Sequence, residues 1–107
     1  MTLEALKRDV CSAIDALRGE LVAVSHAIHE NPELAFEERF AANLLTKTVE
    51  RHALPVERGA YKVETAYASE FGPNGAPVMS LLSEYDALPG IGHACGHNVI
   101  ATIGLGA

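Results

Sequence analysis

The side chains best suited to metal chemistry lie in one short loop near the end of the 107-residue chain. Positions 85–97 read Tyr-Asp-Ala-Leu-Pro-Gly-Ile-Gly-His-Ala-Cys-Gly-His, and a mostly apolar segment precedes them. Cysteine thiolates and histidine nitrogens are good ligands for zinc and other divalent transition metals, and aspartate commonly orients a metal-bound histidine. Cys95 and His97 are therefore the candidate metal ligands, with Asp86 as an acidic neighbour.

The place of this loop in the predicted fold favours the same interpretation. Ligands of open α/β sheets collect at the carboxyl ends of strands, and Glu84 and Asp86 follow a segment predicted to be a buried strand. Alternate side chains of extended backbone point the same way, so we expect Glu84 and Asp86 to point together. The same alternation would align His93 with Cys95 and His97.

Each of these residues also has an ordinary structural explanation. Cys95 could be a small buried core residue, as free cysteine often is. His97 could cap a helix or form a hydrogen bond, and Asp86 could begin a turn before Pro89. We expect His93 to support the loop rather than to bind metal. Cys-x-His is a short pattern that also arises by chance, so spacing alone leaves these explanations open.

Other titratable residues, earlier in the chain, are explained by helix ends. His29 lies at the predicted end of the first helix, where the helix dipole favours a cation. Glu33, Glu37 and Glu38 lie before or within the first turn of the next predicted helix, where negative charge is favoured. Cys11 adjoins an apolar helix stripe, and we expect it to serve packing.

Apolar periodicity and turn residues predict the elements that position this loop. One apolar stripe recurs at steps of three and four from Leu3 to Ile28, which indicates a single long helix ending near Glu30, before Pro32. Thr2 is the expected N-cap of that helix. The other predicted elements are a helix over 37–51, a half-exposed strand over 62–71, a hairpin-type turn over 72–75, a strand buried on both faces over 77–83, and a helix with Asn98 as candidate cap.

The predicted order of elements is helix-helix-strand-strand-loop-helix, which favours the α/β class. The sequence contains no internal repeat, linker or low-complexity stretch. The last helix reaches Ala107 without a stop signal, and a short isolated helix is marginal. We therefore expect the chain to be the N-terminal part of a larger protein.

Composition excludes several classes of partner. The chain is 49% hydrophobic and 21% charged, as in ordinary globular proteins, and its net charge is −6 with no basic cluster, which argues against nucleic-acid binding. Its apolar runs are too short to cross a bilayer, and its first ten residues lack the apolar core of a signal peptide. Two cysteines make no disulfide framework. We expect a cytoplasmic protein without a membrane partner.

The motif residues resemble a known family. The stretch from Glu84 to Asn98 is similar to the M20 metallopeptidase and amidohydrolase family, above all to its aminobenzoyl-glutamate hydrolase and M20 domain-containing protein 2 branch. A second segment, His-Glu-Asn-Pro-Glu-Leu at 29–34, resembles the family's early His-x-x-Pro-Glu-Leu signature. Asn98 stands where many relatives carry Asp, which is typical of this branch. Glu84 stands where other branches carry a ligand His or an Asp, which leaves its role open.

The resemblance implies roles for three residues of the loop. Cys95 and His97 inherit the positions of metal ligands, and Asp86 inherits the acidic position that supports the metal site, the one catalytic position that the chain retains. The implied cofactor is a pair of divalent ions, zinc, manganese or cobalt. The implied reaction is hydrolysis of an amide bond in a small dipeptide or in an N-acyl or aminobenzoyl amino acid conjugate.

The resemblance also implies a larger protein. Residues 1–107 would be the N-terminal part of a three-layer α/β/α zinc-peptidase-like catalytic domain, without the lid and dimerisation domain or the C-terminal catalytic half. The complete enzyme would be a homodimer. The catalytic Glu pair and the remaining His ligands of the family are not in the chain, so we expect the isolated chain to be inactive. The alternative is a non-catalytic truncated homologue that serves as a metal-binding or partner-binding module.

Overall fold

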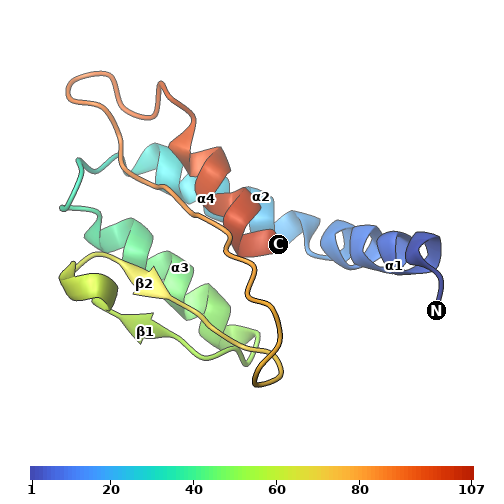
Figure 1. The fold of residues 1–107 in the computed structure, drawn as a ribbon. Helices are drawn as coiled ribbons and strands as arrows, with labels where there is room; N and C mark the ends of the chain where they lie inside the picture. Colours follow the sequence, from blue (N-terminus) through green and yellow to red (C-terminus); the bar gives the residue numbers. More distant parts are fainter.

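The computed structural model describes residues 1–107 as four α-helices and one small sheet (Figure 1). The helices are α1 (Leu3–Ala16), α2 (Arg18–Glu30), α3 (Arg39–Arg51) and α4 (His97–Gly106). The strands are β1 (Glu57–Arg58) and β2 (Tyr67–Ala68), with the 3-10 turn η1 (Ala60–Lys62) between them. The chain is thus a helix-rich domain with a two-stranded sheet, consistent with the α/β class. None of the helices has the length and apolar character needed to cross a membrane.

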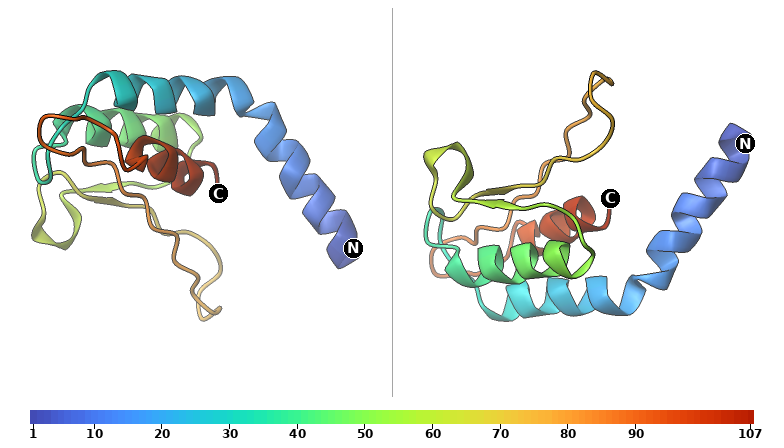
Figure 2. Two further views of the ribbon diagram at one scale, coloured as in Figure 1. Left: turned by 90° about the horizontal axis from the view of Figure 1, so that it is seen from above. Right: turned by 90° about the horizontal axis from the view of Figure 1, so that it is seen from below.

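The first predicted helix is two helices that separate at Leu17. The Leu17 N–H donates to the Ile14 carbonyl (3.0 Å), which tightens the last turn of α1, and the helical pattern resumes when Leu21 N–H donates to the Leu17 carbonyl (3.0 Å). Gly19, a poor helix former, follows the break. α1 therefore meets the N-terminal end of α2 at an angle and projects from the rest of the molecule (Figure 2). The prediction of one continuous helix was wrong. The predicted cap is confirmed, because the hydroxyl of Thr2 accepts the Ala5 N–H (3.1 Å).

The hydrophobic core lies where α2 packs against α3 and α4. Its buried members come from all three helices and from the segment before the loop: Val24, Ile28, Ala41, Leu45, Tyr85 and Ala101. The apolar stripe therefore reaches the core only in α2. No residue of α1 is buried, although α1 carries the same periodicity.

The second predicted helix is confirmed as α3, with its start two residues later than expected. Its first turn is capped from the preceding loop, because the Glu33 carboxylate accepts the N–H groups of Phe40 (2.8 Å) and Ala41 (2.9 Å). These N–H groups have no partner within the helix, so a carboxylate here satisfies them and complements the helix dipole. Glu33 thus has the helix-start role expected of it.

The strand predicted over 62–71 is mostly absent. Only Tyr67–Ala68 is a strand, and it pairs antiparallel with Glu57–Arg58, which the sequence pattern did not indicate. In the register, Glu57 lies opposite Ala68 and Arg58 opposite Tyr67. Tyr61 and Lys62 have positive φ angles of 57° and 62°, which are incompatible with a strand. Apolar alternation was therefore a poor guide where the backbone turns.

The segment over 77–83 is not the buried strand that was predicted. It pairs with no other segment, and Val78, Met79 and Leu82 are between 76% and 88% exposed. The turn before it is present, because the Ala76 N–H donates to the Pro73 carbonyl (3.3 Å), but the flanking segments form no hairpin. An apolar run becomes a buried strand only when neighbouring strands and two covering layers are available. None of the 107 residues provides them.

The end of this segment crosses closely over α4. The Ser83 hydroxyl donates to the Ala101 carbonyl (2.9 Å). Gly104 lies at the crossing, where a Cβ atom would come within 3.1 Å of both the Leu82 carbonyl oxygen and the Ser83 Cβ. A larger residue at position 104 would push the two elements apart.

α4 begins at His97, directly after Gly96, which has a φ of 77°. Asn98 does not cap the helix, so that expectation was wrong. Its side-chain amide donates to the Ser25 hydroxyl (3.1 Å) and thereby joins α4 to α2. This contact matters for the site because it fixes the first turn of α4, on which His97 stands.

Candidate metal centre

His97 lies between two carboxylates at the start of α4. Its Nδ1 is 2.8 Å from Asp86 Oδ1 and 3.0 Å from the Asp86 carbonyl oxygen. Its Nε2 is 3.2 Å from Glu84 Oε2. With Nδ1 donating to Asp86, the tautomer and the orientation of the ring are fixed, and Nε2 is the nitrogen available for other chemistry.

Backbone hydrogen bonds fix the loop directly after Asp86. The Ala87 N–H donates to the Glu33 carbonyl (2.7 Å), which ties the site to the loop that caps α3. Beyond it, Leu88 and Gly92 exchange both backbone hydrogen bonds (3.0 and 3.2 Å) and close a short turn. Gly92 has a φ of 68°, a conformation that a side chain would strain. The loop is therefore shaped by long-range contacts.

His93 is buried and has no hydrogen-bond partner on either ring nitrogen. Burial lowers its pKa, and His29 and His97 lower it further, while Asp86 acts in the opposite direction. The ring of His29 lies 6.3 Å away, centroid to centroid. His93 is thus packed within the loop, and the supporting role expected for it stays a prediction.

Cys95 is exposed. It was expected to align with His97 on extended backbone, but the positive φ of Gly96 turns the chain between them. It is not the buried core residue that was the alternative. No three His, Cys, Asp or Glu side chains lie close enough together to hold a metal ion. The structure places Glu84 and Asp86 on opposite sides of the His97 ring, so the three side chains do not converge on one point, and it leaves Cys95 at the surface.

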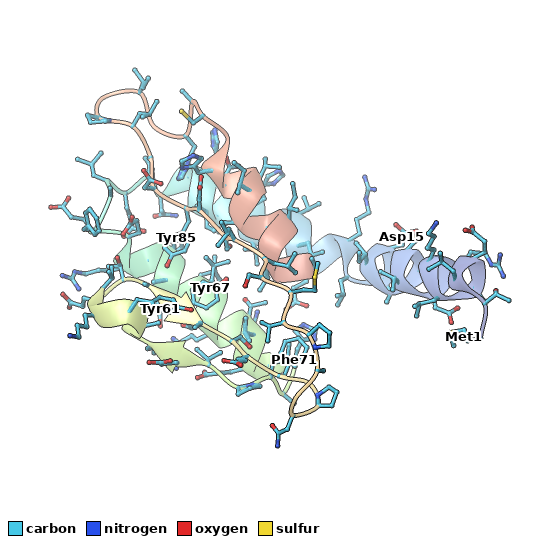
Figure 3. The ribbon with its side chains drawn as sticks, viewed as in Figure 1. Met1, Asp15, Tyr61, Tyr67, Phe71 and Tyr85 are labelled. Carbon is cyan, nitrogen blue, oxygen red and sulfur yellow. The ribbon has the colours of Figure 1, made fainter.

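A buried polar network behind the carboxylates was missed by the sequence reasoning. The Thr65 hydroxyl donates to Glu38 (2.7 Å), and the Tyr85 hydroxyl donates to the Thr65 carbonyl (2.5 Å). Tyr85 also stacks on Tyr67, with centroids 6.2 Å apart (Figure 3). Burial raises the pKa of Tyr85 to about 12. Tyr85 follows the mostly apolar segment over 77–83 and stands between Glu84 and Asp86. This Tyr is the one signal that could have revealed the network, since a buried phenol needs a partner.

A groove of about 160 Å³ lies between this network and the carboxylates. Glu38, Thr65, Glu84 and Asp86 contribute to its lining. Phe36 stands on the same groove with a φ of 67°, which is unusual for a bulky residue. The surface beside Glu84 and Asp86 is therefore concave.

Comparison with known proteins identifies relatives over nearly the whole chain. The Xaa-Arg dipeptidase of Homo sapiens is 43% identical over 118 aligned residues, which cover 98% of this chain and 27% of that protein. A p-aminobenzoyl-glutamate hydrolase polypeptide of Escherichia coli (strain K12) is 32% identical, with 94% and 24% covered. The IAA-amino acid hydrolase ILR1-like 6 of Arabidopsis thaliana is 34% identical, with 81% and 21% covered. No protein-family model matches the chain.

The chain belongs to the M20 family of amidohydrolases. The resemblance expected from the sequence motifs is confirmed, and it extends across both motif segments. The chain spans about a quarter of the length of the curated relatives that it matches.

The donor set of this M20 chain fits part of a metal centre. A histidine whose Nδ1 is held by a carboxylate presents Nε2 as a ligand, which is the usual arrangement around zinc. Zinc sites use three or four protein ligands. On the outer side of the His97 ring only two possible donors lie together, Nε2 of His97 itself and the Glu84 carboxylate. The residues present therefore fit a divalent ion but supply only part of its coordination.

Proposed function

We propose that the protein is a metal-dependent hydrolase that cleaves an amide bond in a small dipeptide or in an N-acyl or aminobenzoyl amino acid conjugate. The support comes from relatives named as a dipeptidase and as hydrolases of amino acid conjugates, which match 81–98% of the chain. The observation that carries the proposal is the Asp86–His97 pair, because it orients a histidine as metal-bound histidines are oriented.

In this proposal each residue of the site has a defined task. When bound, a divalent ion supplies Lewis-acid activation of water and of the amide carbonyl. His97 would hold the ion through Nε2, and Asp86 keeps the ring in the required tautomer. Cys95 remains a candidate ligand by its position in the motif, and it would have to turn inward from the surface. The groove beside Glu84 and Asp86 would admit the substrate.

We also propose that residues 1–107 are part of a larger three-layer α/β/α catalytic domain that holds two divalent ions. The exposed apolar segment over 77–83 supports this, because its composition suits a strand covered on both faces. The incomplete donor set supports it as well, because the ions would need ligands beyond those gathered here. Zinc, manganese and cobalt all suit nitrogen and carboxylate ligands.

A non-catalytic role is the second candidate, and one observation favours it. Every carboxylate that approaches His97 is engaged with the histidine itself, so none is free to act as a general base. A chain with only these residues could still bind metal or a partner.

Hydrolysis by the protein in its complete natural form tests the proposal. Purified protein would be assayed with zinc, manganese or cobalt against an Xaa-Arg dipeptide, p-aminobenzoyl-glutamate and an indoleacetyl amino acid. We expect turnover of at least one substrate, and its loss in His97→Asn but not in Glu57→Gln, a change at an exposed position of β1. The 107-residue chain alone should show no turnover. Binding of metal without hydrolysis by the complete protein would favour the non-catalytic role instead.

A further inference from the structure

Tyr85 stands between the two carboxylates of the site, yet its own side chain lies in the hydrophobic core. Glu84 and Asp86 both contact His97, at 3.2 and 2.8 Å. Tyr85 is buried with the core residues of α2, α3 and α4, and its ring stacks on Tyr67 of β2 (Figure 3). Because the three residues are consecutive, a displacement of Tyr85 would move both carboxylates.

The backbone around Tyr85 has few restraints of its own. Within residues 77–86 no backbone N–H or carbonyl bonds to another backbone group. Apart from the contacts with His97, two side-chain hydrogen bonds hold this segment. The Ser83 hydroxyl donates to a backbone carbonyl of α4 (2.9 Å), and the Tyr85 hydroxyl donates to the Thr65 carbonyl (2.5 Å). The position of the site carboxylates therefore depends in large part on the Tyr85 phenol.

Thr65 continues this connection to the start of α3. Its hydroxyl donates to Glu38 Oε2 (2.7 Å), while its carbonyl accepts from Tyr85. All three residues are buried, so water competes little for these bonds. Glu38 directly precedes α3, which contributes Ala41 and Leu45 to the core. The hydrogen-bonded set of Tyr85, Thr65 and Glu38, the anchor, thus ties the site segment to a packed helix.

A purely structural role is the competing explanation for the anchor. A buried carboxylate and a buried phenol each need a hydrogen-bond partner, whatever the neighbouring site does. The anchor residues, however, also line the groove on which Glu84 and Asp86 stand. The two explanations differ in what the loss of the anchor does to the His97 ring.

We propose that Tyr85 is a positioning residue that holds Asp86 against His97, and that it acts through its anchor on Thr65 and Glu38. The proposal rests on the proposed function in that Asp86 and His97 belong to its metal site. Without the phenol hydroxyl, the segment around Asp86 shifts and no longer keeps the imidazole in one tautomer. A divalent ion is then held less tightly, because the partners that orient a ligand histidine contribute about tenfold or more to metal affinity.

Nuclear magnetic resonance of the His97 ring nitrogens tests the anchor in metal-free protein of complete natural length. At a pH where the ring is neutral, the unchanged protein should carry the proton on Nδ1, which faces Asp86. Tyr85→Phe and Thr65→Val should show a mixture of both tautomers. Thr65→Ser keeps the hydroxyl and should match the unchanged protein. Calorimetry with zinc should show about tenfold weaker binding for Tyr85→Phe, a change in the same direction for Thr65→Val, and none for Thr65→Ser.

Val49→Ala is the matched control for a general loss of stability. Val49 is buried toward the other end of α3, so its truncation weakens the fold without touching the anchor. Its His97 tautomer and zinc affinity should be those of the unchanged protein. In the hydrolysis assay, Tyr85→Phe should lower kcat about tenfold and change KM by less than about twofold, because the substitution misplaces the site and leaves the groove its shape.

The outcomes separate the anchor from the proposed function. If Tyr85→Phe keeps one tautomer and full zinc affinity, or if Val49→Ala has the same effects as Tyr85→Phe, the anchor is only structural and the proposal fails, whether or not the protein hydrolyses a substrate. If the tautomer changes as expected but the unchanged protein turns over no substrate, the anchor stands and the proposed function fails. Should Tyr85→Phe not fold, the comparison of Thr65→Val with Thr65→Ser decides by the same readouts.

Discussion

α1 and α2 carry one continuous apolar stripe in the sequence but lie in different environments. Val24 and Ile28 of α2 are 3% and 0% exposed, whereas Leu6 and Val10 of α1 are 48% and 50% exposed. Both segments form helices because their apolar residues recur at helical spacing and the polar residues between those positions also favour a helix. The two helices differ in their neighbours, since α3 and α4 both pack against α2, whereas α2 is the main packing partner of α1.

The difference shows that amphipathic periodicity determines local structure but not burial. The hydrophobic contribution of a side chain depends on the apolar area that the fold removes from water. At Leu17 the helix axis turns away from α3 and α4. The stripe residues that precede Leu17 in the sequence, all on α1, are therefore not buried. The same holds for the apolar run over 77–83, which also lacks a covering layer.

The largest effect that would test this comparison is loss of a core side chain. Ile28→Ala should lower the free energy of unfolding by about 2–4 kcal/mol, because it leaves a cavity among α2, α3 and α4. The matched change Val10→Ala in α1 should cost less than about 0.5 kcal/mol, because it opens no cavity. Urea unfolding followed by circular dichroism measures both. Equal costs would mean that α1 is packed in solution.

Sequence reasoning was accurate where the determinants are local. The Thr2 cap and the helix over 37–51 depend on neighbouring residues, and both are present. The orienting contact between Asp86 and His97 agrees with the expectation from metal-site chemistry. The break at Leu17 was not predictable, because the apolar steps are the same on both sides of it.

The remaining features of the site depend on backbone turns that side-chain patterns do not encode. The expected alignment of Cys95 with His97 assumed extended backbone, which the φ of 77° at Gly96 excludes. The contact between Asn98 and Ser25 joins residues 73 positions apart, and no local rule pairs them. The Glu38–Thr65 hydrogen bond likewise depends on how the sheet segment folds back over α3.

The second prediction concerns buried Tyr85 and the loss of folding stability at alkaline pH. Its folded pKa is about 12 and its reference value is 10.0, so the folded state keeps a proton that the unfolded state loses between these values. The stabilisation is complete below pH 10 and is lost as the pH rises through 12, by about 2–3 kcal/mol in all. Stability measured from pH 9 to 12 should fall less steeply in Tyr85→Phe. Tyr61→Phe, at an exposed position, should keep the slope of the unchanged protein.

The third prediction concerns the cap of α3. Glu33→Gln should destabilise the protein by about 1 kcal/mol, because an amide satisfies the N–H groups of Phe40 and Ala41 less well than a carboxylate and does not complement the helix dipole. Glu37→Gln is the matched control, since Glu37 caps no N–H group. Thermal unfolding compares the two. A smaller effect for Glu33 than for Glu37 would show that the loop does not hold this cap in solution.

The smallest effect on stability, and the sharpest contrast with α2, is expected on α1. Replacing Leu6 and Val10 together by Ser should change the free energy of unfolding of the isolated chain by less than about 0.5 kcal/mol, since neither side chain is buried. The same change should clearly reduce binding of a hydrophobic fluorescent dye, because it removes part of the exposed apolar stripe. Amide hydrogen exchange should be fast throughout α1 and slow around Val24 and Ile28, because local opening of α1 breaks no core contact. If exchange in α1 is as slow as in α2 and the double change destabilises the chain by more than about 1 kcal/mol, α1 folds back onto the body in solution, and the contrast between the two helices is lost.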